Sequence, residues 1–221
     1  MKTLIIAPHA DDETLGLGGT LLKRSSKKGN KLYWLLITEP QLPDYNQKFI
    51  YSRIKQIQKI KKIYNFEKTF NLNLKPGSLD KISKKKLVLE ISNIIKLIKP
   101  DEIFTPHLGD VHSDHKIISS VISTCTKNFR FKSIKRIFAY ETLSETNFNL
   151  IKKNAFFPNY YEDISKFMNK KIKALKIYKS EVKKFPFPRS IDAIKALAKV
   201  RGSEIGVNFA EAFEVLKIIK K

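Results

Sequence analysis

The chain has 221 residues, of which 42% are hydrophobic and 15 are phenylalanine, so it can bury the core of one α/β domain and is not a disordered chain. No apolar run approaches the roughly 18 residues of a membrane span, and the apolar start at residues 4–7 ends too early for a signal peptide. We therefore expect a cytoplasmic protein without a transmembrane segment. The single cysteine, Cys125, excludes an internal disulfide framework.

The net charge of +22 is compatible with binding to nucleic acid, to an anionic membrane surface or to an anionic substrate. Lysine is spread over nearly every predicted helix, however, and no nucleic-acid-binding motif is evident. A compositional bias of the whole chain explains the charge equally well. We predict no specific nucleic-acid partner, but non-specific attraction to polyanions at low salt.

Strands and helices alternate over the first 140 residues. Apolar runs predict strands at 4–8, 32–38, 69–74, 102–105 and 131–140. Helical periodicity predicts helices at 14–28, 49–64, 81–98 and 116–126. Strand–helix–strand units with buried strands indicate an α/β fold built on a parallel sheet.

The C-terminal third has a different pattern. Residues 156–161 are aromatic and predict a turn, and Ser165 is a suitable N-cap for a helix that ends near 179. A further helix is predicted at 191–201, and the type of element at 210–219 is left open. Since we find no linker and no repeat, we expect a single domain over 1–221, with 150–221 as its C-terminal extension.

The four histidines of the chain all follow predicted strands. His9 opens the segment His-Ala-Asp-Asp-Glu, and the other three lie in the acidic segment 107–115. Ligands of open α/β folds bind at the carboxyl ends of the strands. Histidine and carboxylate are ordinary zinc ligands, and catalytic zinc usually takes three of them. The sequence therefore predicts a zinc site formed by His9, Asp12 and one histidine of the second segment.

A catalytic zinc lowers the pKa of its bound water toward about 7. Because the side chains of Asp11 and Asp12 diverge, Asp11 is better placed to take the proton of this water than to bind the same ion. A second histidine could stabilise the developing oxyanion or protonate the leaving amine.

Both segments resemble the motifs of a known family. Pro8 to Glu13, with Gly18 and Gly19 downstream, looks like the opening motif of the PIG-L/LmbE-like N-acetylglucosamine deacetylases, and His112-Ser113-Asp114-His115 is similar to their second motif. In the C-terminal third the resemblance is to the bacterial sugar and thiol-glycoside deacetylase branch. Its residues include Phe157-Pro158-Asn159, Tyr178 with Ser180, Pro188-Arg189-Ser190 and Ala210-Glu211-Ala212-Phe213.

The resemblance implies a Rossmann-like, three-layer α/β/α hydrolase that uses one Zn²⁺ per chain to remove acetyl from an N-acetylated amino sugar. It makes His9, Asp12 and His115 the zinc ligands and Asp11 the general base. His112 would assist the oxyanion or the leaving group, oriented by Asp114. It also implies a homo-oligomer.

Three further residues are candidates for substrate binding. Arg53 matches an arginine that contacts substrate in some family members, although Gln56 stands where an acid is expected after it. Asp110 replaces a tyrosine of one family branch and cannot donate a hydrogen bond when ionised. His107 could line the substrate entrance or be structural. Ala10 replaces the proline of many members without changing the spacing of the ligands.

Two alternatives remain open at this stage. The motifs carry the chemistry and not the substrate pocket, so a metal-dependent amidohydrolase acting on a non-sugar acyl amide fits equally well. A basic polyanion-binding protein would have a closed, structural metal site instead of an open one. The charge favours a nucleotide-linked or lipid-linked amino sugar as substrate. We expect loops 39–48 and 141–162 to form the pocket wall.

Overall fold

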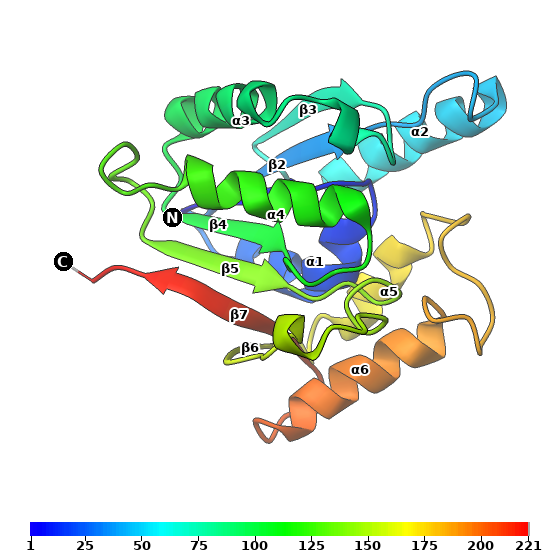
Figure 1. Ribbon diagram of the computed structural model, residues 1–221. Helices are drawn as coiled ribbons and strands as arrows, with labels where there is room; N and C mark the ends of the chain where they lie inside the picture. The colour runs from blue at the N-terminus through cyan, green and yellow to red at the C-terminus, as the bar shows by residue number, and fades with distance from the viewer. Residues whose placement is uncertain (221) are drawn as a thin grey trace.

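The computed structural model describes residues 1–220, which form a seven-stranded sheet between layers of helices (Figure 1). The strand order is β3-β2-β1-β4-β5-β7-β6. Strands β1 to β5 run parallel to one another, whereas β7 pairs antiparallel with both β5 and β6. The strands are β1 (Lys2–Ala7), β2 (Lys31–Thr38), β3 (Lys68–Leu74), β4 (Glu102–Pro106), β5 (Arg136–Tyr140), β6 (Tyr160–Asp163) and β7 (Ala210–Ile218).

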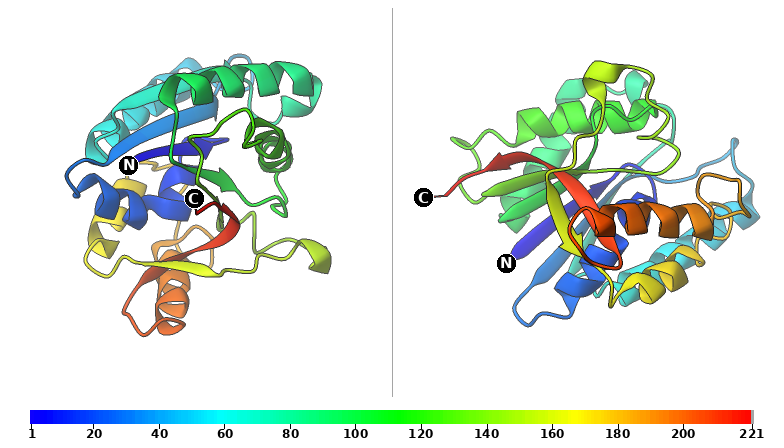
Figure 2. Two further views of the ribbon diagram at one scale, coloured as in Figure 1. Left: turned by 90° about the vertical axis from the view of Figure 1, so that its left-hand side faces the viewer. Right: turned by 90° about the horizontal axis from the view of Figure 1, so that it is seen from below.

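Helices cover both faces of this sheet. Apolar side chains of α1 (Asp12–Ser25), α2 (Gln47–Ile63) and α5 (Met168–Leu175) form one core, and those of α3 (Lys84–Ile98) and α4 (Ser113–Cys125) form the other. Figure 2 shows the two helical layers on opposite sides of the strands. The helix α6 (Ile191–Ser203) packs against α1 and α5 through Ile194 and Ala198. The predicted three-layer, mostly parallel α/β fold is confirmed.

Two short 3-10 helices, Leu79–Lys81 and Lys152–Asn154, lie in connecting segments. Among residues 1–220, no helix combines the length and apolar character needed to cross a bilayer.

The predicted elements of the first 140 residues have the correct type, and their ends agree to within about three residues except at one strand. Residues 131–135 are a turn in the structure, and β5 begins only at Arg136. Phe131 and Ile134 are buried there, so their apolar character reflects anchoring of a loop to the core.

The C-terminal third differs more from the prediction. Residues 160–163 and 210–218 are strands, and α5 begins at Met168 and ends at Leu175. Its N-cap position is Phe167 and not Ser165, whose hydroxyl instead donates to Asp163 Oδ1 at 2.6 Å. Only the end of the aromatic segment, from Tyr160, enters a strand, because it pairs with β7, a contact about 50 residues away that local pattern does not reveal.

A kink in α1 is stabilised from the C-terminal third. Leu17 has non-helical dihedral angles (φ −143°, ψ 22°). The N–H groups of Gly19 and Thr20 donate to the carboxylate of Glu211 on β7, at 2.8 and 2.7 Å. Lys171 Nζ donates to the carbonyl of Leu15 and to Glu211. One buried ion pair therefore satisfies backbone groups that the kink frees.

We predict that Glu211→Ala lowers the free energy of unfolding by about 3–5 kcal/mol, because it removes the only carboxylate that neutralises the buried Lys171 ammonium and leaves two helix N–H groups without their acceptor. Denaturant unfolding monitored by circular dichroism measures this loss. Glu67→Ala is the matched control, since Glu67 pairs with Lys31 at the surface, and its expected cost is below about 1 kcal/mol. Equal costs for the two variants would contradict the account.

Candidate active site

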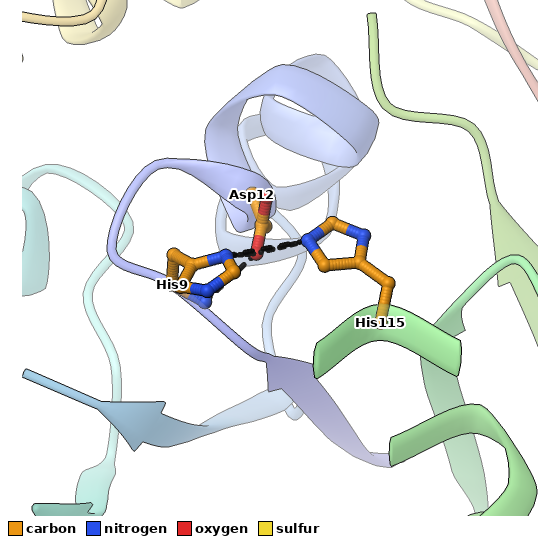
Figure 3. Close-up of side chains that lie close together, drawn as sticks. All are labelled: His9, Asp12 and His115. Atoms are coloured by element: carbon orange, nitrogen blue, oxygen red, sulfur yellow. Dashed lines mark hydrogen bonds and ion pairs between the residues drawn. The ribbon is translucent and has the colours of Figure 1, made fainter. Parts of the chain in front are cut away.

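The site lies where the strand order reverses, between β1 and β4. These strands pair in parallel, so their carboxyl ends meet at the same edge of the sheet. His9 and Asp12 follow β1, and His115 lies in the first turn of α4, after β4. The topology thus joins two segments about a hundred residues apart in sequence (Figure 3).

Three side-chain atoms converge at this edge. The distance from Asp12 Oδ2 is 3.4 Å to His9 Nδ1 and 3.3 Å to His115 Nε2, and the two nitrogens lie 3.3 Å apart. Ligands about 2.0–2.1 Å from a tetrahedral zinc ion are separated by about 3.3–3.4 Å. The donor set and its spacing therefore fit a zinc ion, which these three side chains would hold.

A second carboxylate orients each histidine. His9 Nε2 donates to Asp114 Oδ2 at 3.0 Å, and His115 Nδ1 donates to Asp110 Oδ2 at 2.8 Å. Thr146 donates in turn to Asp110 Oδ1 at 2.6 Å. Carboxylate–histidine pairs of this kind fix the ring so that its other nitrogen faces a metal. Asp114 thus contacts His9 with its carboxylate, and not His112 as expected.

The carboxylates also set the charge of the cluster. Burial lowers the pKa of His9, but hydrogen bonds to Asp114 and Asp12 raise it to about 9 overall. Burial likewise opposes the charge of His115, while Asp12 and Asp110 raise its pKa to about 10. The same negative field attracts a divalent cation, which competes with protons for these nitrogens.

Asp11 is held next to this cluster in an uncommon backbone conformation, with φ 155°. Its N–H donates to Glu13 Oε2 at 3.1 Å, and Arg53 donates to the carbonyl of Ala10. Burial, together with the negative charge of Asp12, raises the pKa of Asp11 to about 7, although Arg189 opposes the rise. A carboxylate with this pKa suits a general base at neutral pH.

His112 faces the same space. Its Nδ1 accepts a hydrogen bond from the N–H of Asp114 at 3.1 Å, and its ring centroid lies 4.4 Å from that of His9. Burial lowers the pKa of His112, and the charges of His9 and His115 lower it further. The neutral ring with Nδ1 as acceptor carries its proton on Nε2, where it can be donated.

A cleft of about 230 Å³ opens beside these groups. Its lining includes the polar side chains of His9, Asp11 and His112 and the apolar or aromatic side chains of Pro40, Tyr45, Phe49 and Pro76. Arg53, Glu181 and Arg189 also line it. Loop 39–48 therefore contributes to the wall, whereas loop 141–162 supplies none of the lining and instead lies behind Arg189 through Ser144 and Glu145.

The structure separates the three residues predicted to bind substrate. Arg53 lines the cleft, but it is 6% exposed and already pairs with Glu181. Asp110 is fully buried behind His115. His107 lies outside the cleft, between Glu214 at 3.0 Å and the carbonyl of Asn154 at 2.9 Å.

Several groups at the site were not assigned roles from the sequence. They are Glu13, Glu181, Arg189 and the stacked pair Tyr45 and Phe49, whose centroids lie 5.2 Å apart. Two of them carried a signal, because Glu13 ends the segment that resembles the family's opening motif and Arg189 lies in Pro188-Arg189-Ser190, which also resembles a family motif. The others become recognisable only when the chain is folded.

Comparisons with known proteins identify the family and the fold. A sequence profile described as PIG-L, GlcNAc-PI de-N-acetylase, matches residues 4–126. Diacetylchitobiose deacetylase of Thermococcus kodakarensis is 23% identical over 95% of this chain and 81% of its own length. Two solved structures are also similar, and at this level of identity they support the fold.

The N,N'-diacetylchitobiose deacetylase of Pyrococcus horikoshii superposes with a TM-score of 0.76 at 22% identity, covering 98% of this chain and 84% of that one. The conserved protein TT1542 of Thermus thermophilus gives 0.79 at 24% identity, covering 99% and 96%. The profile spans more than half of the chain and includes both histidine segments. The resemblance seen in the sequence is therefore confirmed, and the chain belongs to the PIG-L family.

Proposed function

We propose that the protein is a zinc-dependent hydrolase that removes the acetyl group from an N-acetylated amino sugar. The observation that carries this proposal is the convergence of His9 Nδ1, Asp12 Oδ2 and His115 Nε2 at the spacing of three tetrahedral ligands. Asp11 and a cleft lie directly beside them. The family membership and the deacetylase relatives support the same reaction.

Zinc held by these ligands would act as a Lewis acid, polarising the amide carbonyl and making water a stronger nucleophile. Asp11 would accept a proton from the attacking water as the new C–O bond forms. His112 would donate its Nε2 proton toward the carbonyl oxygen, which gains negative charge, or toward the leaving nitrogen. Cleavage of the C–N bond, with a proton passed to the leaving nitrogen from Asp11 or His112, would then yield acetate and the free amine.

The cleft favours an uncharged sugar ring over an anionic group. Both of its arginines already face carboxylates: Arg53 pairs with Glu181, and Arg189 with Asp11, Glu145 and Glu181. Tyr45 and Phe49 offer an aromatic surface for the apolar face of a pyranose. The net charge of +22 on the chain is therefore not concentrated around the acetamido group of the substrate. A nucleotide or lipid attached to the sugar would extend beyond the cleft.

An open site favours catalysis over the polyanion-binding alternative. Three protein ligands leave one position facing a cleft, whereas a structural zinc site is closed by four. A non-sugar acyl amide is the other alternative, and a substrate assay separates it from an N-acetylated amino sugar.

We predict that the purified protein binds about one Zn²⁺ per chain and that His115→Ala loses it, since one of three ligands is removed. Asp11→Asn should retain the metal and lose about 10²–10⁴-fold in kcat for acetate release, because the amide cannot accept the proton. Metal analysis and an acetate assay over N-acetylglucosamine conjugates measure both. A fully active Asp11→Asn variant would exclude Asp11 as the base.

We predict that His112→Gln also lowers kcat by about 10²–10⁴-fold while its zinc content stays at the wild-type level. The reason is that His112 faces the cleft but stands outside the three converging ligand atoms. Measuring metal content and kcat on the same preparation separates the two roles. Loss of zinc in step with activity would show that His112 is a ligand instead.

We predict that a neutral N-acetylglucosamine glycoside is deacetylated with a higher kcat/KM than N-acetylglucosamine 1-phosphate, because the carboxylates around both arginines repel the phosphate. The comparison should be made at low and at physiological salt, since screening weakens such repulsion. A clear preference for the phosphate would contradict the charge assignment. Release of acyl groups only from non-sugar amides would move the substrate to the alternative class.

A further inference from the structure

Arg189 lies in the C-terminal third, outside the segment matched by the family profile, yet it touches the candidate base. Its guanidinium contacts four side chains. It reaches Asp11 Oδ2 at 2.9 Å, Ser144 Oγ at 2.7 Å, Glu145 Oε1 at 3.0 Å and Glu181 Oε2 at 3.4 Å. A planar group with this many fixed partners has a single orientation.

The backbone around Arg189 is also fixed. The next residue, Ser190, is the N-cap of α6 and accepts a hydrogen bond from the N–H of Ala193 at 3.1 Å. On the other side, the N–H of Glu145 donates to the carbonyl of Thr142 at 3.0 Å. The guanidinium is therefore held between two ordered segments that do not belong to the metal cluster.

The fixed guanidinium of Arg189 in turn holds the carboxylate of Asp11. Its Oδ2 is engaged by Arg189, whereas within residues 1–220 no hydrogen bond reaches its Oδ1. The carboxylate lines the cleft, so the oxygen that is not held by Arg189 is the one left for a substrate water. Without Arg189, the Asp11 side chain could rotate about its two torsion angles, and its free oxygen would no longer be held toward the cleft.

We propose that Arg189 is a positioning residue that fixes the carboxylate of Asp11 for proton transfer, so that the C-terminal third completes the active site. This inference rests on the proposed function, since positioning matters only if Asp11 acts as the base. Two other roles for Arg189 have different signatures. A contact with substrate would change KM, and a purely structural role would lower the metal content in step with activity.

The experiment compares Arg189→Gln, Arg189→Lys and Arg189→Ala with Arg201→Gln. Arg201 is the matched control because it lies on α6, the helix that Ser190 caps. It pairs with Glu141 at 2.8 Å, away from the cleft. For each variant, Tm, zinc content, kcat and KM are measured. Arg189→Ala is also assayed with added guanidinium ion.

We expect Arg189→Gln and Arg189→Ala to lower kcat by about 10²-fold, the size of effect typical of a misplaced catalytic group. KM should change by less than about threefold with zinc content retained, because the substitution disturbs Asp11 and removes no contact with substrate. Tm should fall, since Asp11, Glu145 and Glu181 lose a cationic partner. Arg189→Lys should recover part of the loss, and guanidinium should raise the kcat of Arg189→Ala. Arg201→Gln should behave as wild type.

Three results would overturn the inference: wild-type kcat in Arg189→Gln, a raised KM with unchanged kcat, or a loss of activity matched by loss of zinc. A crystal structure of zinc-loaded Arg189→Gln provides a readout without turnover, in which an unmoved Asp11 carboxylate also contradicts the inference. If wild type releases no acetate while the Asp11 carboxylate still rotates in this variant, the proposed function fails and the positioning contact stands.

Discussion

The parallel pairing of β1 with β4 is the constraint on which the site depends. It places the carboxyl ends of two strands together and leaves space between the segments that follow them. His9 and Asp12 enter this space from one strand end, and His115 enters it from the other. Because the strands are buried and their register is fixed, three ligand atoms are preorganised at 3.3–3.4 Å from one another.

Preorganisation at this point has an electrostatic cost that the surrounding carboxylates offset. Burial makes charged imidazoles unfavourable, yet Asp12, Asp110 and Asp114 raise the pKa of His9 and of His115. The cluster is thus built to hold positive charge. Arg189 and Arg53 meet the remaining carboxylates, Asp11 and Glu181, from outside the cluster. The chain's large positive charge therefore contributes little within the cleft.

The sequence predicted the parts of the molecule that depend on local pattern. The strands and helices to residue 140, the parallel fold and the two histidine segments follow from apolar periodicity and from residue types that favour zinc. The errors arise where long-range pairing decides the structure. Residues 160–163 become a strand through β7, and Glu211 caps a kink in α1 from the far end of the chain. Similarly, His107 resembles a site residue in sequence but pairs with Glu214 on β7.

The most direct test of the zinc site is anomalous X-ray scattering at the zinc absorption edge from crystals of the zinc-loaded protein. The account predicts one peak per chain, about 2.0–2.2 Å from His9 Nδ1, Asp12 Oδ2 and His115 Nε2, with the fourth position directed into the cleft. A peak elsewhere, or a fourth protein ligand that closes the site, would contradict the assignment of this cluster as a catalytic zinc centre.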